Sequence, residues 1–452
     1  MPIVQATEPA AMRPLPCLRS WLAGCERGLL LGVTLLIVAV PLAQMAARTL
    51  FGFDLIGAGA LSQNLALWIG WLGAIAAAVR GQHLGFGDAL QRLVPGLQRG
   101  RTALVALVSA GISAWLFLAA AEFVRIEMES EAEIGGWLPI WVAELALPIG
   151  LFGVTTSYFF TRGASRFAAL LGFPAAALAA HLVGGNGVGT ALPVLALLVL
   201  AFMLGAPIFV LIGGAALLLF AATDVPTAIV AAEAYRMATS PIIPAIPLFT
   251  LVGFLMTASR ASERLVEVFR ALFGWAPGGV AFASVLVCAF FASFTGSSGV
   301  VILALGGLLV PVLTRAGYAE RFSIGLVTSA GSAGLLLPPS LALILFAVVA
   351  QISILDLFVA SLLPAAIMIF GIAGFAVWRG IFNGATRERF EPARAVRAMW
   401  VARWELATPV IALGGIFLGF TTLLEAAALT VGYTLFVSTV IHREIDPRRE
   451  LG

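Results

Sequence analysis

Apolar residues in this chain occur in long runs separated by short polar stretches, from near the N-terminus to near the C-terminus. A helix needs roughly 20 mostly apolar residues to cross a bilayer. The first part of the chain contains four runs of about that length, near residues 28–47, 58–79, 102–121 and 137–160. Since only helices and closed barrels satisfy their backbone groups in lipid, this pattern predicts an all-α polytopic membrane protein.

The second part of the chain repeats this pattern after a connecting run at 167–183, which contains Pro174 and ends in a glycine-rich loop. Further spans are predicted near 189–205, 208–222, 246–259, 357–378, 406–420 and 422–441. We therefore divide the chain into residues 1–165, a connecting helix and loop at 166–187, and residues 188–452.

Between Val280 and Val312, two apolar runs are each too short to cross a bilayer. They flank a polar tip, Thr295-Gly296-Ser297-Ser298-Gly299. Lipid cannot satisfy the backbone groups that such small residues expose, so the tip belongs inside protein or in a water-lined cavity. The pattern predicts a re-entrant hairpin. Ser297 and Ser298 offer hydroxyl oxygens, which hard cations such as sodium prefer; alternatively, these small residues only allow two helices to approach closely.

A second interrupted element is predicted at 322–350, where Gly331 and Gly334 precede Pro338-Pro339-Ser340. Tandem proline removes two backbone donors and clashes with the preceding turn. An unwound segment at membrane depth frees carbonyl groups for a cation, while half-helix N-termini favour anions. A proline kink used only for packing is the alternative. The presence of both the hairpin tip and the break favours a transport site.

Composition and charge refine this picture. The chain is 61% hydrophobic and 11% charged, and its basic residues cluster between alternate spans. The positive-inside rule then places both termini in the cytoplasm. Charge cannot distinguish a hairpin from two full spans, because both return the chain to the same side. The segment 83–99 is amphipathic and is either an interfacial helix or a basic loop.

Acidic residues inside the apolar runs are rare. Glu144 lies within the fourth span, where charge is costly and usually faces protein. Glu122 and Arg125 are one turn apart and could pair. Glu425 opens the last span, where we favour stabilisation by the helix dipole over a ligand role. The sequence contains no recognisable catalytic triad, no cysteine spacing typical of a metal site and no phosphate-binding loop. We therefore expect that the protein is not an enzyme, has no cofactor and binds no nucleic acid.

Several motifs together resemble the membrane part of a TRAP (tripartite ATP-independent periplasmic) transporter with fused small and large subunits. In the first part they are Trp68-Ile69-Gly70-Trp71, Arg80-Gly81-Gln82-His83 and Leu147-Pro148-Ile149-Gly150. In the second part they are Ile246-Pro247-Leu248-Phe249, Gly296-Ser297-Ser298, Pro338-Pro339-Ser340 and Glu425-Ala426-Ala427-Ala428.

The resemblance implies a four-span small-subunit bundle plus the first inverted repeat of an elevator-type transporter. It implies sodium-coupled symport of a small organic anion, often a dicarboxylate, across the bacterial inner membrane. A periplasmic substrate-binding protein would deliver the substrate. Sodium would be the coupling ion, with Ser297 and Ser298 as its ligands. The residues that would border the sodium site and the substrate are Gly296, Ser297, Ser298, Gly331, Gly334, Pro338, Pro339 and Ser340.

The sequence departs from the family in one respect. The large subunit of the family has two inverted repeats, and residues 188–452 contain one hairpin tip and one break. The second sodium site and half of the substrate pocket are therefore expected to be absent. Another chain could supply them in a split transporter, the chain could form an unusual dimer, or it could be a truncated, non-transporting remnant. A channel is a further alternative, which would conduct ions without a binding protein.

Overall fold

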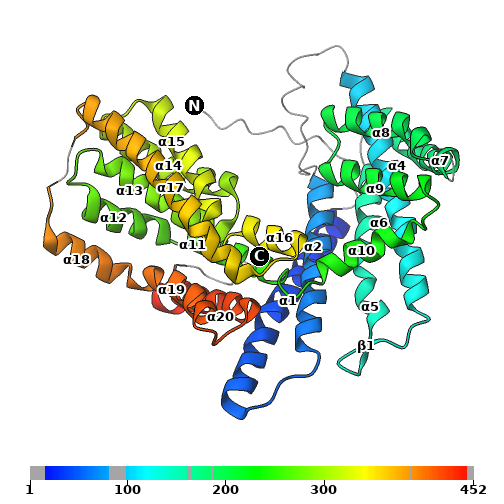
Figure 1. Ribbon diagram of the computed structural model, residues 1–452, viewed down its shortest axis with the longest axis horizontal. Helices are drawn as coiled ribbons and strands as arrows, with labels where there is room; N and C mark the ends of the chain where they lie inside the picture. The colour runs from blue at the N-terminus through cyan, green and yellow to red at the C-terminus, as the bar shows by residue number, and fades with distance from the viewer. Residues whose placement is uncertain (1–15, 81–97, 160–163, 185–186, 387–388, 445–452) are drawn as a thin grey trace. The chain divides into compact units, whose positions relative to one another are not determined.

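The computed structural model describes residues 16–80, 98–159, 164–184, 187–386 and 389–444 (Figure 1). The amphipathic segment predicted at 83–99 falls almost entirely outside these residues. The chain forms two compact units: residues 1–34 with 64–239, and residues 35–63 with 240–452. Each unit is described by itself.

The described part of the chain is helical apart from one short strand pair. Up to residue 239 the elements are α1 (Pro16–Ala46), η1 (Ala47–Phe51), α2 (Ala58–Arg80), α4 (Gln98–Glu127), β1 (Glu133–Ile134), β2 (Leu138–Pro139), α5 (Ile140–Glu144), α6 (Ala146–Phe159), α7 (Ala164–Val183), α8 (Val188–Met203), α9 (Ile208–Ala222) and α10 (Ala228–Ala238). The strands β1 and β2 are antiparallel.

From residue 240 onward the elements are α11 (Ala245–Ala258), α12 (Ala261–Phe273), α13 (Gly279–Thr295), α14 (Ser298–Arg315), α15 (Glu320–Ala333), η3 (Gly334–Leu336), α16 (Leu341–Ala350), α17 (Ile354–Phe382), α18 (Pro392–Val401), α19 (Arg403–Phe417), α20 (Leu423–Phe436) and η4 (Val437–Ile441). Every predicted span overlaps one or more of these helices. The apolar runs did not predict the shorter helices α10, α12 and α18.

The multi-span prediction agrees with the described helices. Seven of them are long and apolar enough to cross a membrane, and the number rises to nine if each of two bent helix pairs counts as one span. One bent pair, α15–η3 with α16, turns by 41° at the predicted proline pair. The other, α11 with α12, turns by 78° at Ser259-Arg260 and was not predicted.

The predicted hairpin forms two helices joined at Gly296-Ser297, but its arms are longer than the apolar runs. The first arm, α13, has 17 residues, and the second, α14, has 18 and is long enough to cross a bilayer. Helix length therefore does not separate a re-entrant hairpin from two spans, and the hairpin stays a prediction.

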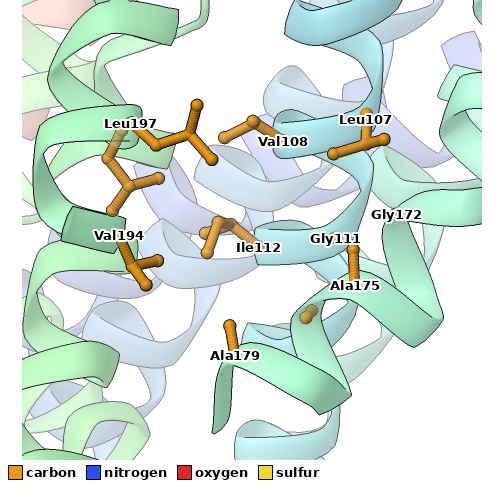
Figure 2. Close-up of a pocket in the computed structure, with 11 residues that line it drawn as sticks. Leu107, Val108, Gly111, Ile112, Gly172, Ala175, Ala179, Val194 and Leu197 are labelled. Carbon is orange, nitrogen blue, oxygen red and sulfur yellow. The ribbon is translucent and has the colours of Figure 1, made fainter. Parts of the chain in front are cut away.

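The core of the first unit is built around α4. Its backbone meets that of α7 where Gly111 faces Gly172, and a methyl group on Gly111 would lie 2.6 Å from the Gly172 carbonyl oxygen. Beside this crossing, α4, α7 and α8 enclose an apolar crevice of about 70 Å³. Figure 2 shows Val108, Ile112 and Val194 around it. Small residues thus bring α4 and α7 together, as is typical of membrane helices.

The core of the second unit is built around α13, of which 14 residues are buried. It packs against α11, α12, α14, α15 and α17, which Figure 1 shows grouped around it. A helix that is apolar on all sides is normally buried in this way. The C-terminal end of α13, where the polar tip begins, is consequently held by several neighbouring helices.

Candidate functional site

The tip begins where α13 ends in a left-handed residue. Gly296 has φ 61°, and its N–H donates to the carbonyl oxygen of Ala292 at 3.0 Å. Glycine adopts this conformation without the steric penalty that a side chain brings. The next residue, Ser297, is extended and is the N-cap of α14. The sequence Gly-Ser therefore reverses the chain within two residues.

The break begins where α15 gives way to the single 3₁₀ turn η3. The N–H of Leu337 donates to the carbonyl oxygen of Gly334 at 3.0 Å, and the Pro338-Pro339 bond that follows is cis. Because Pro339 has no N–H, it cannot donate to the carbonyl oxygen of Leu335 as a helical residue would. The break thus leaves a backbone acceptor without its helical donor.

The tip and the break lie against each other. Gly296 packs on Leu341, the first residue of α16, so closely that a methyl group on Gly296 would overlap the Leu341 side chain. A methyl group on Gly331 would lie 3.7 Å from the carbonyl oxygen of Ser298. One on Gly334 would lie 2.5 Å from the carbonyl oxygen of Ala289 in α13. Glycine at 296 and 334 is what lets the two elements approach, whereas position 331 has room for a methyl group. We call residues 295–299 and 331–340 the tip-and-break region.

The serine residues predicted for the site differ in their burial and in whether their hydroxyl groups cap a helix. Ser340 is buried, and its hydroxyl oxygen accepts the N–H of Ala342 at 3.2 Å, which caps α16. Ser297 and Ser298 are half-buried, and the Ser297 side chain makes no cap hydrogen bond to α14. The first amide groups of α14 are therefore free of a side-chain cap, unlike those of α16.

The tip-and-break region owes its polarity to the backbone. Residues 279–314 and 322–355 contain no Asp, Glu, Lys, Arg or His. The N-terminus of α14 carries the partial positive charge of a helix dipole, and the carbonyl groups at the break carry partial negative charge. Such a pair of unlike partial charges can accommodate an anion on one side and a small cation on the other.

Gly253 and Tyr318 stand in motifs that resemble the family, but neither of them was predicted to have a role beside the tip or the hairpin. Gly253 of α11 packs on the tip, where a methyl group would lie 2.6 Å from Cγ2 of Thr295. At the far end of α14, the Tyr318 hydroxyl donates to the carbonyl oxygen of Ala376 at 3.1 Å, and burial raises the pKa of this phenol. The motifs pointed to these two residues, but their packing partners are distant in sequence and could not be predicted.

Two predictions about acidic residues, for Glu425 and for the pair of Glu122 with Arg125, had opposite outcomes. Glu425 lies in the first turn of α20, where it forms a capping box with Thr422, and its carboxylate also accepts from Arg48 at 2.7 Å. The expected N-terminal role is confirmed. Glu122 and Arg125 are both exposed, and within the described residues no ion pair joins them, so that prediction is wrong. Solvent competes well with such surface pairs.

A charged cluster in the second unit was not predicted. Arg264 of α12 binds Glu405 of α19 at 2.7 Å and Glu444 beyond η4 at 2.6 Å. The N–H of Arg260 donates to Glu444 at 2.9 Å. His442 Nε2 lies 3.3 Å from the Glu405 carboxylate. These residues are distant in sequence, so no local pattern could reveal them. We call Arg264, Glu405 and Glu444 the charged cluster.

Comparisons with known proteins match two parts of the chain. The model of the tripartite ATP-independent periplasmic transporter, DctM component, matches residues 194–451. That of the DctQ component matches residues 37–162.

Relatives include the isethionate TRAP transporter permease protein DctMQ of Oleidesulfovibrio alaskensis, 36% identical over 55% of this chain and 39% of that protein. The C4-dicarboxylate TRAP transporter large permease protein DctM of Rhodobacter capsulatus is 31% identical over 57% of this chain and 62% of its own length. The ectoine/5-hydroxyectoine TRAP transporter large permease protein UehC of Ruegeria pomeroyi is 32% identical over 45% of this chain and 47% of its own length. The chain thus spans between 39% and 62% of these relatives.

Proposed function

The chain belongs to the tripartite ATP-independent periplasmic transporter family, and we propose that it is a membrane component of a secondary transporter that imports small organic anions with sodium. The family consists of transporters, so the prediction that the chain is not an enzyme is confirmed. Its relatives are named for isethionate, C4-dicarboxylates and ectoine, and this spread leaves the class of substrate broader than dicarboxylates.

The observation that carries the proposal is the contact of the tip with the break. Gly296 packs on Leu341 and Gly331 faces the Ser298 carbonyl oxygen, in a stretch of chain that has no charged side chain. In this arrangement sodium would be held by carbonyl and hydroxyl oxygens, including those of Ser297 and Ser298. The anion would meet the uncapped N-terminus of α14. Pro338, Pro339 and Ser340 would set the position of α16 rather than bind directly.

The setting of this site is part of the same proposal. The chain is a multi-pass membrane protein, and we place it in the bacterial inner membrane with both termini in the cytoplasm, because its arginine clusters follow the positive-inside rule. A periplasmic binding protein would deliver the substrate. The tip-bearing helices would move as an elevator against a scaffold that includes residues 1–165.

Sodium binding can be measured without any substrate. We expect the unfolding midpoint of the purified chain to rise in sodium chloride relative to choline chloride, because a ligand that binds only the folded state stabilises it. Ser298→Ala and Gly331→Val should reduce this rise, since one removes an oxygen and the other fills the space beside Ser298. Thr328→Ala is the matched control, because Thr328 lies outside the tip-and-break region, is exposed and bonds Ile324 of its own helix. Equal midpoints in both salts would count against sodium coupling.

Transport itself needs proteoliposomes, an inward sodium gradient and the cognate binding protein. Uptake of labelled succinate, isethionate or ectoine should require both the gradient and the binding protein. Ion flux without the binding protein would indicate a channel instead. No uptake even with a co-expressed polypeptide that carries a second hairpin and break would overturn the transport proposal.

A further inference from the structure

The first unit contains a buried carboxylate that the proposed transport site does not use. Glu144 is 1% exposed, and its Oε2 atom has no hydrogen-bond partner. Among the described residues no arginine or histidine forms an ion pair with it. An ionised carboxylate that is buried without a partner is strongly unfavourable, in a membrane protein as in a soluble one.

Local sequence explains why Glu144 lies at an interruption of the helix. It is the last residue of α5, and α6 begins at Ala146 after Leu145. Pro148, four residues further on, has no N–H to offer the carbonyl oxygen of Glu144. Glu144 therefore presents two kinds of oxygen at one place, a buried carboxylate and a main-chain carbonyl that lacks its helical donor.

Tyr235 of α10 lies near this carboxylate and is bonded to a second neutral polar group. The Tyr235 hydroxyl of α10 donates to Oδ1 of the buried Asn64 of α2 at 3.0 Å, and the Tyr235 ring packs on Phe123. Burial raises the pKa of Tyr235 to about 12, and the carboxylates of Glu144 and Glu127 act in the same direction. The phenol therefore stays protonated and leaves its oxygen lone pairs available toward Glu144.

The titratable groups that face Glu144 are thus Glu127 from α4 and Tyr235 from α10, and neither is cationic. The carboxylates of Glu144 and Glu127 both carry negative charge here, and the nearby Tyr235 and Asn64 side chains are neutral. A cation is therefore needed to balance the charge of the buried Glu144. Divalent ions are poorly suited, because among the described residues no three His, Cys, Asp or Glu side chains converge to hold a metal. One positive charge balances one buried carboxylate.

We propose that Glu144, together with Tyr235 and Asn64, forms a monovalent-cation site in the first unit, separate from the tip-and-break region. The cation that binds there is a proton or a sodium ion, because both bind to a negatively charged carboxylate oxygen. This proposal does not rest on the proposed transport function, because Glu144, Tyr235 and Asn64 all lie within residues 64–239, outside the tip-and-break region.

Carbodiimide labelling tests the proposal on the purified full chain in detergent. Dicyclohexylcarbodiimide reacts with protonated carboxyl groups in apolar surroundings, and peptide mass spectrometry locates the adduct. We expect Glu144 to be labelled at acid pH, and labelling to slow as pH rises. The exposed Glu129 serves as an internal control that should stay unlabelled. Glu144→Gln should remove the adduct.

The same assay separates the two occupants. If sodium chloride, but not choline chloride, slows labelling, the site takes sodium; if only pH affects labelling, it takes a proton. Tyr235→Phe keeps the ring and removes the hydroxyl, so about tenfold more sodium or proton should be needed for the same effect. No adduct on Glu144, or a labelling rate that ignores both pH and sodium, would overturn the proposal. Both outcomes can be read from wild-type protein even if the variants fold poorly.

Discussion

The tip-and-break region and the charged cluster belong to the same unit but handle polarity in opposite ways. In the charged cluster, one arginine with 14% exposure is satisfied by two carboxylates at 2.6–2.7 Å. In the tip-and-break region, no side chain carries charge, and the polar atoms are serine and threonine hydroxyls together with backbone amide and carbonyl groups. In the charged cluster the charges are paired within the chain, whereas the tip-and-break region has polar groups without such partners.

This difference bears on which region can bind something. A paired arginine has its hydrogen-bonding capacity filled, and breaking the pair leaves uncompensated charge. Unpaired backbone dipoles hold only partial charges, so a ligand can enter and leave without breaking an ion pair. We infer that the charged cluster fastens α12 to α19 and to the chain beyond η4, whereas the tip-and-break region keeps its polar groups for a ligand.

The largest expected effect comes from breaking the charged cluster. Arg264→Met should lower the free energy of unfolding by about 3–5 kcal/mol, because the buried Glu405 and the half-buried Glu444 both lose their arginine partner. Unfolding in mixed micelles measures this. Arg260→Met is the control, since the Arg260 side chain is 72% exposed and should change stability by less than about 0.5 kcal/mol. Equal losses in the two variants would show that the cluster is not a fastening point.

The second largest effect on stability is expected from adding a side chain at Gly296 in the tip. Gly296→Val should lower the free energy of unfolding by about 2–4 kcal/mol, because a branched residue is strained at φ 61° and would overlap Leu341. Gly306→Ala in α14 is the matched control, because no atom lies within 4 Å of the added methyl group. It should be neutral or stabilising by up to about 1 kcal/mol. A neutral Gly296→Val would mean that the tip does not pack on the break.

A smaller effect comes from uncapping a helix that, unlike α14, has its N-terminus satisfied by side chains. Thr422→Ala removes the hydroxyl that accepts the Glu425 N–H in the capping box of α20. The free energy of unfolding should fall by about 1 kcal/mol. Thr328→Ala is the control, because that exposed hydroxyl bonds its own helix at Ile324. If both variants behave alike, the capping box contributes nothing measurable.

The smallest expected effect is a pH dependence confined to the charged cluster. Burial of Glu444 disfavours its charge, but hydrogen bonds from Arg264 and from the Arg260 N–H outweigh this and hold its pKa below 4.5. A lowered pKa means that the stabilisation is present above 4.5 and is lost as the pH falls through the folded-state value. Unfolding midpoints between neutral and acid pH should fall less in Glu444→Gln than in wild type. The uncharged tip-and-break region has no group that titrates there.

Sequence reasoning recovered the helical spans and two interruptions of the second unit, at Gly296 and at Pro338-Pro339, because glycine and proline act on the backbone locally. It also recovered the N-terminal role of Glu425, which depends only on position in the first helical turn. It missed the bend at Ser259-Arg260, since α12 is amphipathic and no proline marks the turn. It erred on Glu122 with Arg125, where spacing allowed a pair that solvent does not favour.

By itself, the sequence determined where the chain is apolar, where its backbone must break, and that Glu144 would be buried in a span, since these follow from hydropathy and local stereochemistry. Tertiary structure decided which parts meet. The packing of Gly296 on Leu341, the joining of Arg264 to Glu405 and Glu444, and the placement of Tyr235 beside Glu144 all link distant segments. Such contacts depend on how helices pack in three dimensions, for which no single stretch of sequence carries a signal.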